Sequence, residues 1–221
     1  KLARSSQVRV LPCSYSKKEI VVAAKSSGEV SYKNHFEFLN DHLRRLELTL
    51  QQQIVRRKLQ SHDMGGLESI DVSEASSKSL AEQIQTASDR IRQRVQNTKR
   101  VDGMLPLLDI VDRFELDDFE RDVLLLALAP ALDKQFGRYF GWLRADPLRQ
   151  QLDVDLALSL RCADMAERIE MRRYFSPRSA LVGNQLIALD RHRMETGDSF
   201  LSLAIRLPQR ILGWLLGEDN L

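Results

Sequence analysis

The chain contains only two cysteines in 221 residues, Cys13 and Cys162, and they lie far apart in the sequence. Two distant cysteines cannot form the framework of a small disulfide-rich domain, and they are too few for a structural zinc site. We therefore expect a protein that folds in a reducing compartment and depends on a hydrophobic core.

Long apolar runs and an excess of one charge are also missing. The longest apolar run, residues 123–132, is interrupted by Pro130 and is much shorter than the roughly 20 residues that span a bilayer. The 33 Lys and Arg residues nearly balance 31 Asp and Glu residues, and a net charge of +2 gives no overall field that would draw the chain onto nucleic acid or lipid. We expect no membrane-spanning segment. A partner that binds through charge would need a local cluster of charged residues.

The motifs of catalysis and nucleotide binding are absent from the sequence. The four histidines do not cluster with cysteine or carboxylate residues at ligand spacing, and no serine lies in a nucleophile elbow. His35 and His42 are seven residues apart, which favours two solvated side chains over a metal site. Gly65-Gly66 does not belong to a GxxxxGK[ST] loop. We expect no catalytic, cofactor-binding or metal-binding residue in this chain.

The first 33 residues predict a basic, serine-containing tail. Residues 1–18 hold five Lys or Arg residues and no acidic residue, a composition typical of a transit peptide, although a disordered tail has the same composition. A transit peptide would place the protein in the plastid stroma, and otherwise we expect a cytoplasmic protein.

A regular apolar spacing begins after this tail and predicts an amphipathic helix over residues 34–60. One face, which we call the N-terminal seam, carries Phe36, Leu39, Leu43, Leu46 and Leu50. We interpret the seam as a candidate docking surface for a partner protein. We expect it to act as a mobile arm that pairs at rest, in antiparallel orientation, with a second helix.

That second helix is expected over residues 80–104, because Leu80, Ile84, Ala87, Ile91 and Val95 repeat the same spacing. Residues 61–79 between the two helices have a glycine pair, many serines and no apolar period, so they predict a flexible linker.

The centre of the chain is the stretch LDDFERDVLLLALAPALDKQFGRYFGW, residues 116–142. Asp117 and Glu120 form the pattern of a capping box, and the helix that follows is apolar almost all round, as expected of a core helix. Pro130 is expected to end or kink this helix, and Asp133 is expected to cap a second core helix.

Residues 105–217 predict a winged-helix domain, so the expected fold class is mainly α with a small β-hairpin. Asp153 is expected to cap the candidate recognition helix over residues 153–162. A helix over residues 164–175 follows, in which Met165, Ile169 and Met171 are expected to fill the core.

Two extended segments, residues 185–189 and 200–207, predict a hairpin, and the loop between them is a candidate wing with Arg191, His192 and Arg193. A final helix follows Pro208 and ends at Gly217, which can adopt the left-handed conformation of a helix C-terminus.

Several of these runs resemble a known family. FERDVLLLALAPALD at residues 119–133, VDLALSL at 154–160 and LPQRILGWLLG at 207–217 are similar to the winged-helix region that precedes the ATPase module in a family of bacterial-type AAA+ ATPases. HFEFLNDHLRRLELTL at residues 35–50 resembles the leading helix of the same family. The resemblance implies that residues 218–221 begin a linker to an ATPase module, which would bind ATP and Mg and through which the protein would form oligomers.

The resemblance also implies a non-catalytic docking and regulatory region, whose partners are other proteins or its own ATPase module. No Walker A loop, Walker B run or arginine finger lies in this chain, so no catalytic residue is assigned from the family. The alternative is a winged-helix protein that binds nucleic acid. Asp153 and Asp155 would repel phosphates at the end of the candidate recognition helix that would face bases, so nucleic acid is not the expected partner. An independent enzyme is the weakest hypothesis.

Overall fold

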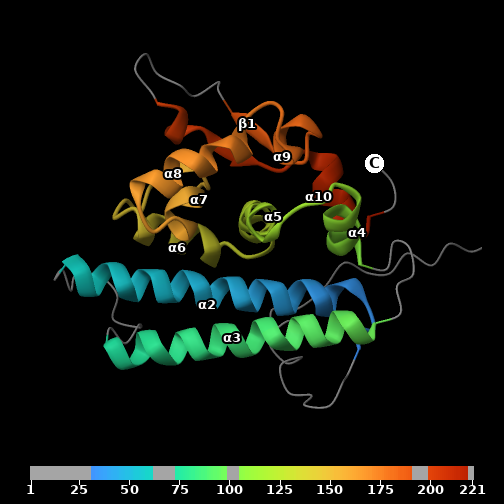
Figure 1. The fold of residues 1–221 in the computed structure, drawn as a ribbon, viewed down its shortest axis with the longest axis horizontal. Helices are drawn as coiled ribbons and strands as arrows, with labels where there is room; N and C mark the ends of the chain where they lie inside the picture. The colour runs from blue at the N-terminus through green and yellow to red at the C-terminus, as the bar shows by residue number, and fades with distance from the viewer. Residues whose placement is uncertain (1–30, 62–72, 99–104, 191–198, 219–221) are drawn as a thin grey trace, which may run out of the picture.

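The fold is a pair of long helices beneath a body of shorter helices (Figure 1). The computed structural model describes residues 31–61, 73–98, 105–190 and 199–218. The described helices are α2 (His35–Ser61), α3 (Glu74–Asn97), α4 (Pro106–Arg113), α5 (Asp118–Leu132), α6 (Gln135–Leu143), α7 (Val154–Arg161), α8 (Met165–Met171), α9 (Ala180–Gly183) and α10 (Gln209–Leu215). Strands β1 (Ala188–Asp190) and β2 (Ala204–Arg206) pair antiparallel. The expected mainly helical fold with a hairpin is confirmed.

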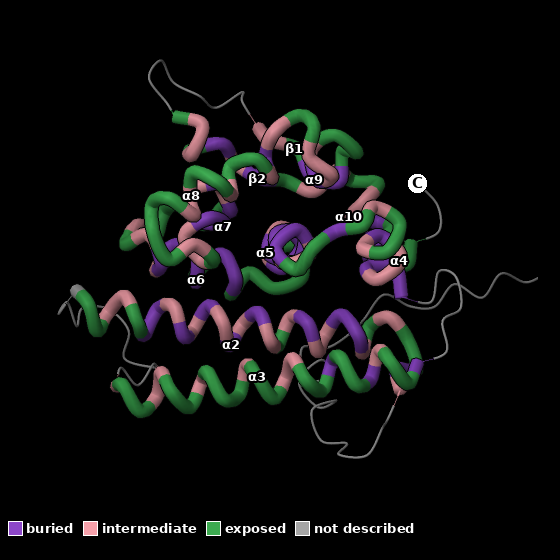
Figure 2. Tube along the Cα trace, in the orientation of Figure 1, coloured by how far each residue is buried: buried purple, intermediate pink, exposed green. Residues whose placement is uncertain are grey.

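Helix α5 lies at the centre of the body, as its sequence predicts (Figures 1 and 2). The Asp117 carboxylate accepts a hydrogen bond from the Glu120 N–H at 2.9 Å, and the Glu120 carboxylate accepts one from the Asp117 N–H at 3.1 Å. This capping box satisfies two N–H groups that the first turn leaves without partners. Leu124 and Leu125 are fully buried. Pro130 lies inside the last turn, and the helix continues to Leu132.

The hairpin is joined by a third extended segment. Leu189 pairs with Ile205 in the β1–β2 ladder. On the other edge of β2, the Ile205 N–H donates to the Leu152 carbonyl at 2.9 Å, and the Val154 N–H donates to the Leu203 carbonyl at 3.1 Å. The expected strand over residues 200–207 is shorter than predicted, because Phe200–Ser202 form a 3-10 turn in which the Leu203 N–H donates to the Phe200 carbonyl.

The order of these elements is that of a winged helix. A first helix, α5, is followed by the extended segment at Leu152, by helices α7 and α8, and then by β1 and β2. α6 and α9 are additional helices within this order, and α10 closes the domain beside α4 (Figure 1).

Helix α3 begins earlier than the sequence suggested. The predicted linker over residues 61–79 is wrong for its last part, because Glu74 already belongs to α3. The Ser73 side chain accepts a hydrogen bond from the Ser76 N–H at 3.1 Å, and Glu74 places a negative charge in the first turn. A good cap and a favourable charge stabilise a serine-rich first turn that resembles a linker in composition. Residues 62–72 lie outside the described part of the chain.

Helix α2 lies between α3 and the body (Figure 1). Leu39, Leu46 and Leu50 belong to the same buried core as α5 and α6. Leu48 lines a groove between α2 and α3, and the Gln52 side chain donates to the Ser77 carbonyl of α3 at 3.2 Å. Helix α2 therefore has two contact faces, of which the sequence pattern indicated one.

A buried arginine joins the start of α2 to the end of α3. Arg94 lies 2.8 Å from both Asp41 and Glu37, and its side chain is 7% exposed. Its guanidinium also lies 4.0 Å from the centre of the Tyr32 ring. Together with the Gln52 contact, these interactions show that the two helices pair in antiparallel orientation. None of the described helices is both long and apolar enough to span a bilayer.

Candidate functional site

The N-terminal seam lies mostly inside the protein. Leu39, Leu46 and Leu50 are at most 6% exposed and Leu43 is partly buried, whereas Phe36 is 57% exposed. The expected mobile arm is therefore wrong. The seam packs against the helical body, and α3 covers the opposite face of α2 rather than the seam. A docking role remains a prediction for Phe36, the most exposed member of the seam.

The histidines of α2 differ in environment, which corrects the expectation of two solvated side chains. His35 is partly exposed, and its Nε2 lies 3.2 Å from the Leu216 carbonyl oxygen at the end of α10. His42 is 4% exposed and packs edge-on against Phe38. Burial, and then the positive charges of Arg45 and Arg121, lower the pKa of His42 to about 3. His42 is therefore a neutral core residue at neutral pH.

The candidate wing residues Arg191, His192 and Arg193 lie outside the described residues. The two strands that flank them are joined by an ion pair of 3.1 Å between Asp190 and Arg206.

Helices α7 and α8 form the helix-turn-helix of the winged helix. The Asp153 carboxylate caps α7 by accepting from the Leu156 N–H at 2.8 Å. The Asp164 carboxylate caps α8 by accepting from the Glu167 N–H at 2.8 Å, and the Glu167 carboxylate accepts from the Ala163 N–H at 2.7 Å. The short turn between the helices makes α8 the second helix of the motif, which is the recognition position.

The helix over residues 153–162, which the sequence favours for recognition, is not the exposed helix of this pair. Val154, Leu156, Ala157 and Leu158 of α7 are at most 1% exposed, so this helix is largely embedded in the core. Of the two acidic residues near its start, Asp155 remains at the surface and forms an ion pair with Arg168 of α8.

Helix α8 is the exposed member of the motif, and no residue of α8 is buried (Figure 2). Met165 is 69% exposed and Ile169 is 64% exposed. The expectation that both side chains fill the core is wrong, because an apolar spacing shows that two residues share a face but not that another element covers it. Met171 is partly buried against the core.

Three arginines surround this apolar pair. Arg168 precedes Ile169 on α8, and Arg172 and Arg173 follow the helix directly in the 3-10 turn Arg172–Phe175. Arg168 forms an ion pair with Asp155 of α7, Arg172 lies 5.0 Å from the centre of the Phe200 ring, and Arg173 is 3.4 Å from Glu170. We call this surface the α8 face; it comprises Met165, Arg168, Ile169, Arg172 and Arg173.

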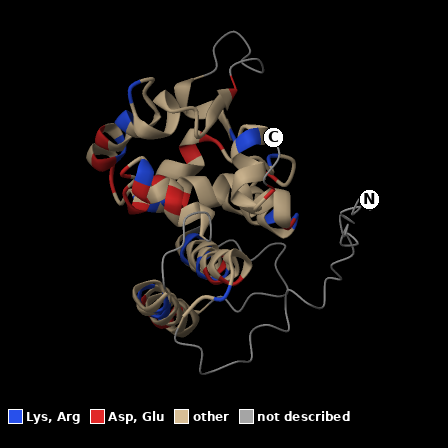
Figure 3. Ribbon diagram, turned by 90° about the vertical axis from the view of Figure 1, so that its right-hand side faces the viewer, with Lys and Arg blue, Asp and Glu red and all other residues tan. Residues whose placement is uncertain are grey.

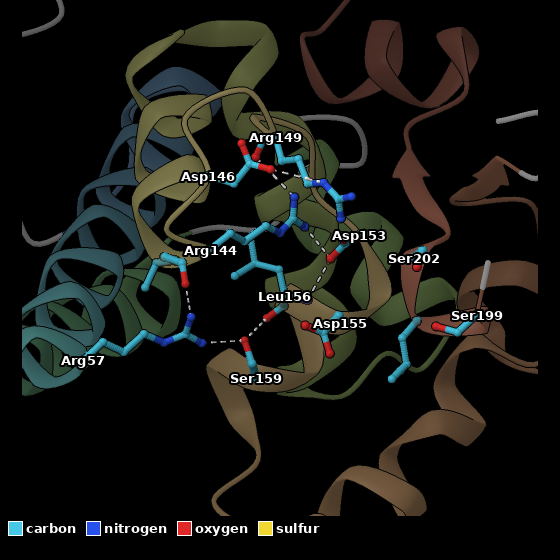
Figure 4. Close-up of a pocket in the computed structure, with 12 residues that line it drawn as sticks. Arg57, Arg144, Asp146, Arg149, Asp153, Asp155, Leu156, Ser159, Ser199 and Ser202 are labelled. Atoms are coloured by element: carbon cyan, nitrogen blue, oxygen red, sulfur yellow. Dashed lines mark hydrogen bonds and ion pairs between the residues drawn. The ribbon is translucent and has the colours of Figure 1, made fainter. Parts of the chain in front are cut away.

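A separate hollow of about 490 Å³ lies where α2, α6, α7 and the segment before β2 meet (Figure 4). Three arginines and three aspartates line it, so their formal charges cancel. The lining charged residues are Arg57, Arg144, Asp146, Arg149, Asp153 and Asp155.

Two partly buried arginines of this hollow, Arg57 and Arg144, are engaged in structural contacts. Arg57 donates to the Leu143 carbonyl and, at 2.9 Å, to the Ser159 hydroxyl, which joins α2 to α6 and α7. Arg144 donates to the Gln151 carbonyl at 2.8 Å and forms an ion pair with Asp153. Burial lowers the pKa of Arg57, and burial raises the pKa of Asp153 despite the opposing effects of its hydrogen bond from Leu156 and of Arg144. We interpret the hollow as a region of structural contacts that hold α2, α6 and α7 together.

The chemistry of the described residues does not indicate catalysis. Among them, no group of three or more His, Cys, Asp or Glu residues could hold a metal ion. Burial raises the pKa of the Cys162 thiol, which disfavours the reactive thiolate. Charges of both signs are intermixed on the helices (Figure 3). The α8 face is therefore the candidate site, and it is a binding surface.

Comparison with known proteins assigns the chain to a family. A family model described as Winged helix domain, variant, matches residues 23–221. No curated protein and no solved structure matches the chain. The matched range includes α2 and α3 as well as the helix-turn-helix and the hairpin. Because the match covers most of the sequence, the chain belongs to the winged helix domain, variant, family.

Proposed function

We propose that this chain is a non-catalytic docking and regulatory region that precedes an AAA+ ATPase module. The observation that carries the docking role is the exposure of Met165 and Ile169 in the recognition position of the helix-turn-helix. Soluble domains bury most residues of this kind, and exposed apolar residues grouped together often mark a protein interface. The link to an ATPase rests on the resemblance of residues 119–133, 154–160 and 207–217 to that family.

The contact between α10 and α2 supports a regulatory role. The left-handed conformation of Gly217, at φ 73°, ends α10, and the His35 ring lies against this glycine. A module joined after Gly217 would therefore be anchored near the start of α2. Movement of α2 relative to the body would change the direction in which such a module is attached.

Nucleic-acid binding is a second candidate, and one observation favours it: Arg168 lies on α8, and Arg172 and Arg173 follow directly in the 3-10 turn Arg172–Phe175. Two observations oppose it. The centre of the surface is apolar, and the chain carries a net charge of only +2. Duplex DNA is bound chiefly through its phosphates by clustered positive charge.

The ATPase link is tested on the coding sequence and on the protein that it encodes. We expect a GxxxxGK[ST] loop downstream of residue 221, ATP hydrolysis by the longer protein, and a changed rate when residues 31–218 are deleted. Residues 1–221 alone should give no heat of ATP-Mg binding in a calorimetric titration, because they lack a phosphate-binding loop. A stop codon at residue 221, or a micromolar ATP site in residues 1–221, would contradict the proposal.

We further propose that the protein functions in the plastid stroma if residues 1–18 act as a transit peptide, and in the cytoplasm otherwise. Import of the labelled chain into isolated chloroplasts, with removal of the basic tail, is the expected result for a transit peptide. Deletion of residues 1–18 should abolish import.

A further inference from the structure

We propose that the α8 face binds an acidic amphipathic helix of a partner protein. This inference rests on the proposed docking role and names the partner by its chemistry. The partner helix would place two apolar side chains against Met165 and Ile169, and glutamate or aspartate residues opposite Arg168, Arg172 and Arg173.

The apolar part of the surface is available and adaptable. Met165 and Ile169 are separated by one helical turn, and they are 69% and 64% exposed. This spacing matches that of side chains on one face of an α-helix, which is how amphipathic helices are recognised in apolar grooves and on apolar faces. The flexible thioether of Met165 can adjust to the shape of the partner.

Contacts at both ends hold α8 in place. At its N-terminus the Asp164 carboxylate accepts a hydrogen bond from the Glu167 N–H, and the Glu167 carboxylate accepts one from the Ala163 N–H. Arg168 joins the helix to Asp155 of α7. The 3-10 turn Arg172–Phe175 follows directly and places Phe175, which is 1% exposed, in the core. The helix is therefore anchored by its two ends, while its Met165–Ile169 face remains open to solvent.

The arginines around Met165 and Ile169 favour a partner with acidic side chains. Arg173 is 65% exposed, and its pairing with Glu170 at 3.4 Å is a surface contact that a partner carboxylate can replace. Arg172 stacks on the Phe200 ring, a contact that leaves the donors of the guanidinium edge for hydrogen bonds. Arg168 uses one of its terminal nitrogens for Asp155. Arginine at the rim of an apolar centre is a favourable arrangement for carboxylate recognition.

The same surface fits duplex DNA less well. The two side chains at its centre, Met165 and Ile169, offer no strong hydrogen-bonding groups for base edges. A partner with an apolar centre and an acidic rim satisfies both parts of the surface.

The test is a selection of random 16-residue peptides displayed on phage, performed with the whole chain. The wild-type protein serves as bait, and a Met165→Ser/Ile169→Ser variant is used for counter-selection. Both replaced side chains are exposed, so the variant should melt like the wild type. Leu148→Ser is the matched control, because Leu148 is 94% exposed but lies on the loop between α6 and α7.

We expect selected peptides with apolar residues three or four positions apart and a net negative charge. A synthetic peptide of the commonest sequence should bind the wild type and the Leu148→Ser variant equally in fluorescence anisotropy. It should bind the Met165→Ser/Ile169→Ser variant at least tenfold more weakly. Arg173→Glu should also weaken binding several-fold, and higher salt should reduce the effect of Arg173 but not that of the apolar pair.

Basic peptides, or peptides whose binding is unchanged in the Met165→Ser/Ile169→Ser variant, would overturn the inference, as would a selection that enriches none. In the same assay, binding of a 20-base-pair duplex that depends on Arg168, Arg172 and Arg173 but not on the apolar pair would overturn it in favour of nucleic acid. The link to an ATPase would survive each of these results, because it is tested by the downstream sequence and by the activity of the longer protein.

Discussion

The imidazole of His35, in the first turn of α2, lies against Gly217, the residue that ends α10. A Cβ atom on Gly217 would lie 2.9 Å from two atoms of the His35 ring, closer than side-chain carbons normally approach. Gly217 also has a φ of 73°, in the left-handed region where glycine is favoured. The start of the N-terminal helix and the end of the winged helix are thus fitted to each other, although 181 residues separate His35 from Leu216.

Gly217→Ala should destabilise the protein by about 2 kcal/mol, because the left-handed conformation costs a residue with a Cβ atom about 1–2 kcal/mol and the His35 ring must also move. Urea unfolding followed by circular dichroism measures this loss. In a His35→Ala background the same substitution should cost about 1 kcal/mol, since only the backbone strain remains. An equal cost in both backgrounds would show that the ring contact does not contribute.

Leu125→Asp should prevent the winged helix from folding. Leu125 is fully buried on α5, and a carboxylate there would cost several kcal/mol, comparable with the ~5–15 kcal/mol stability of a whole domain. The matched control is Leu148→Asp at a site 94% exposed, where a change of at most about 0.5 kcal/mol is expected. Cooperative thermal melting of the Leu125→Asp variant near the wild-type temperature would mean that α5 is not the central helix.

Local signals in the sequence were sufficient for much of the fold. The capping box of Asp117 and Glu120, the cap of Asp153 and the left-handed Gly217 depend on residues within a few positions of one another, and all three are present. The sequence predicts the position of the hairpin correctly, but the second strand is shorter than predicted. Its ends depend on the segment at Leu152, which is distant in sequence and contributes hydrogen bonds that no local pattern encodes.

The candidate site was harder to predict because exposure is a tertiary property. Met165 and Ile169 have the spacing of core residues, and only the packing of α7 and the 3-10 turn shows that nothing in the described chain covers them. The second face of α2 was missed for a similar reason. Leu48 and Gln52 lie among polar residues, and their contact with α3 depends on the pairing of two helices.

The stability of the protein should fall as the pH is lowered below 6.5. His42 is buried and its pKa is lowered to about 3, so the unfolded chain binds a proton between pH 6.5 and pH 3 that the folded chain excludes. This difference costs about 1.4 kcal/mol for each pH unit, or about 2 kcal/mol at pH 5. Urea unfolding at pH 7 and pH 5 measures it.

His42→Phe should remove this contribution from the pH dependence, because phenylalanine does not titrate. His35→Gln, which retains His42, should leave it in place. If His42→Phe and the wild type lose the same free energy between pH 7 and pH 5, other groups are responsible for the acid sensitivity.

The pairing of α2 with α3 is expected to depend on Arg94. Arg94→Met would keep most of the side-chain volume but would leave the carboxylates of Asp41 and Glu37 without their buried partner, and the contact with the Tyr32 ring would lose its charge. Removing one member of a buried ion pair typically costs about 3–5 kcal/mol, and the lower value is expected here because Asp41 and Glu37 retain some access to water.

Arg92→Met is the matched control on the same helix. Arg92 is 69% exposed and pairs with Asp89 at 3.2 Å, and a surface pair of this kind contributes at most about 0.5 kcal/mol. Hydrogen exchange should show faster opening of α3 in the Arg94→Met variant, while α5 keeps its protection because its capping box and core contacts are unchanged. Similar exchange of α3 in both variants would mean that the apolar contacts of Ile91 and Leu48, rather than the buried arginine, hold the two helices together.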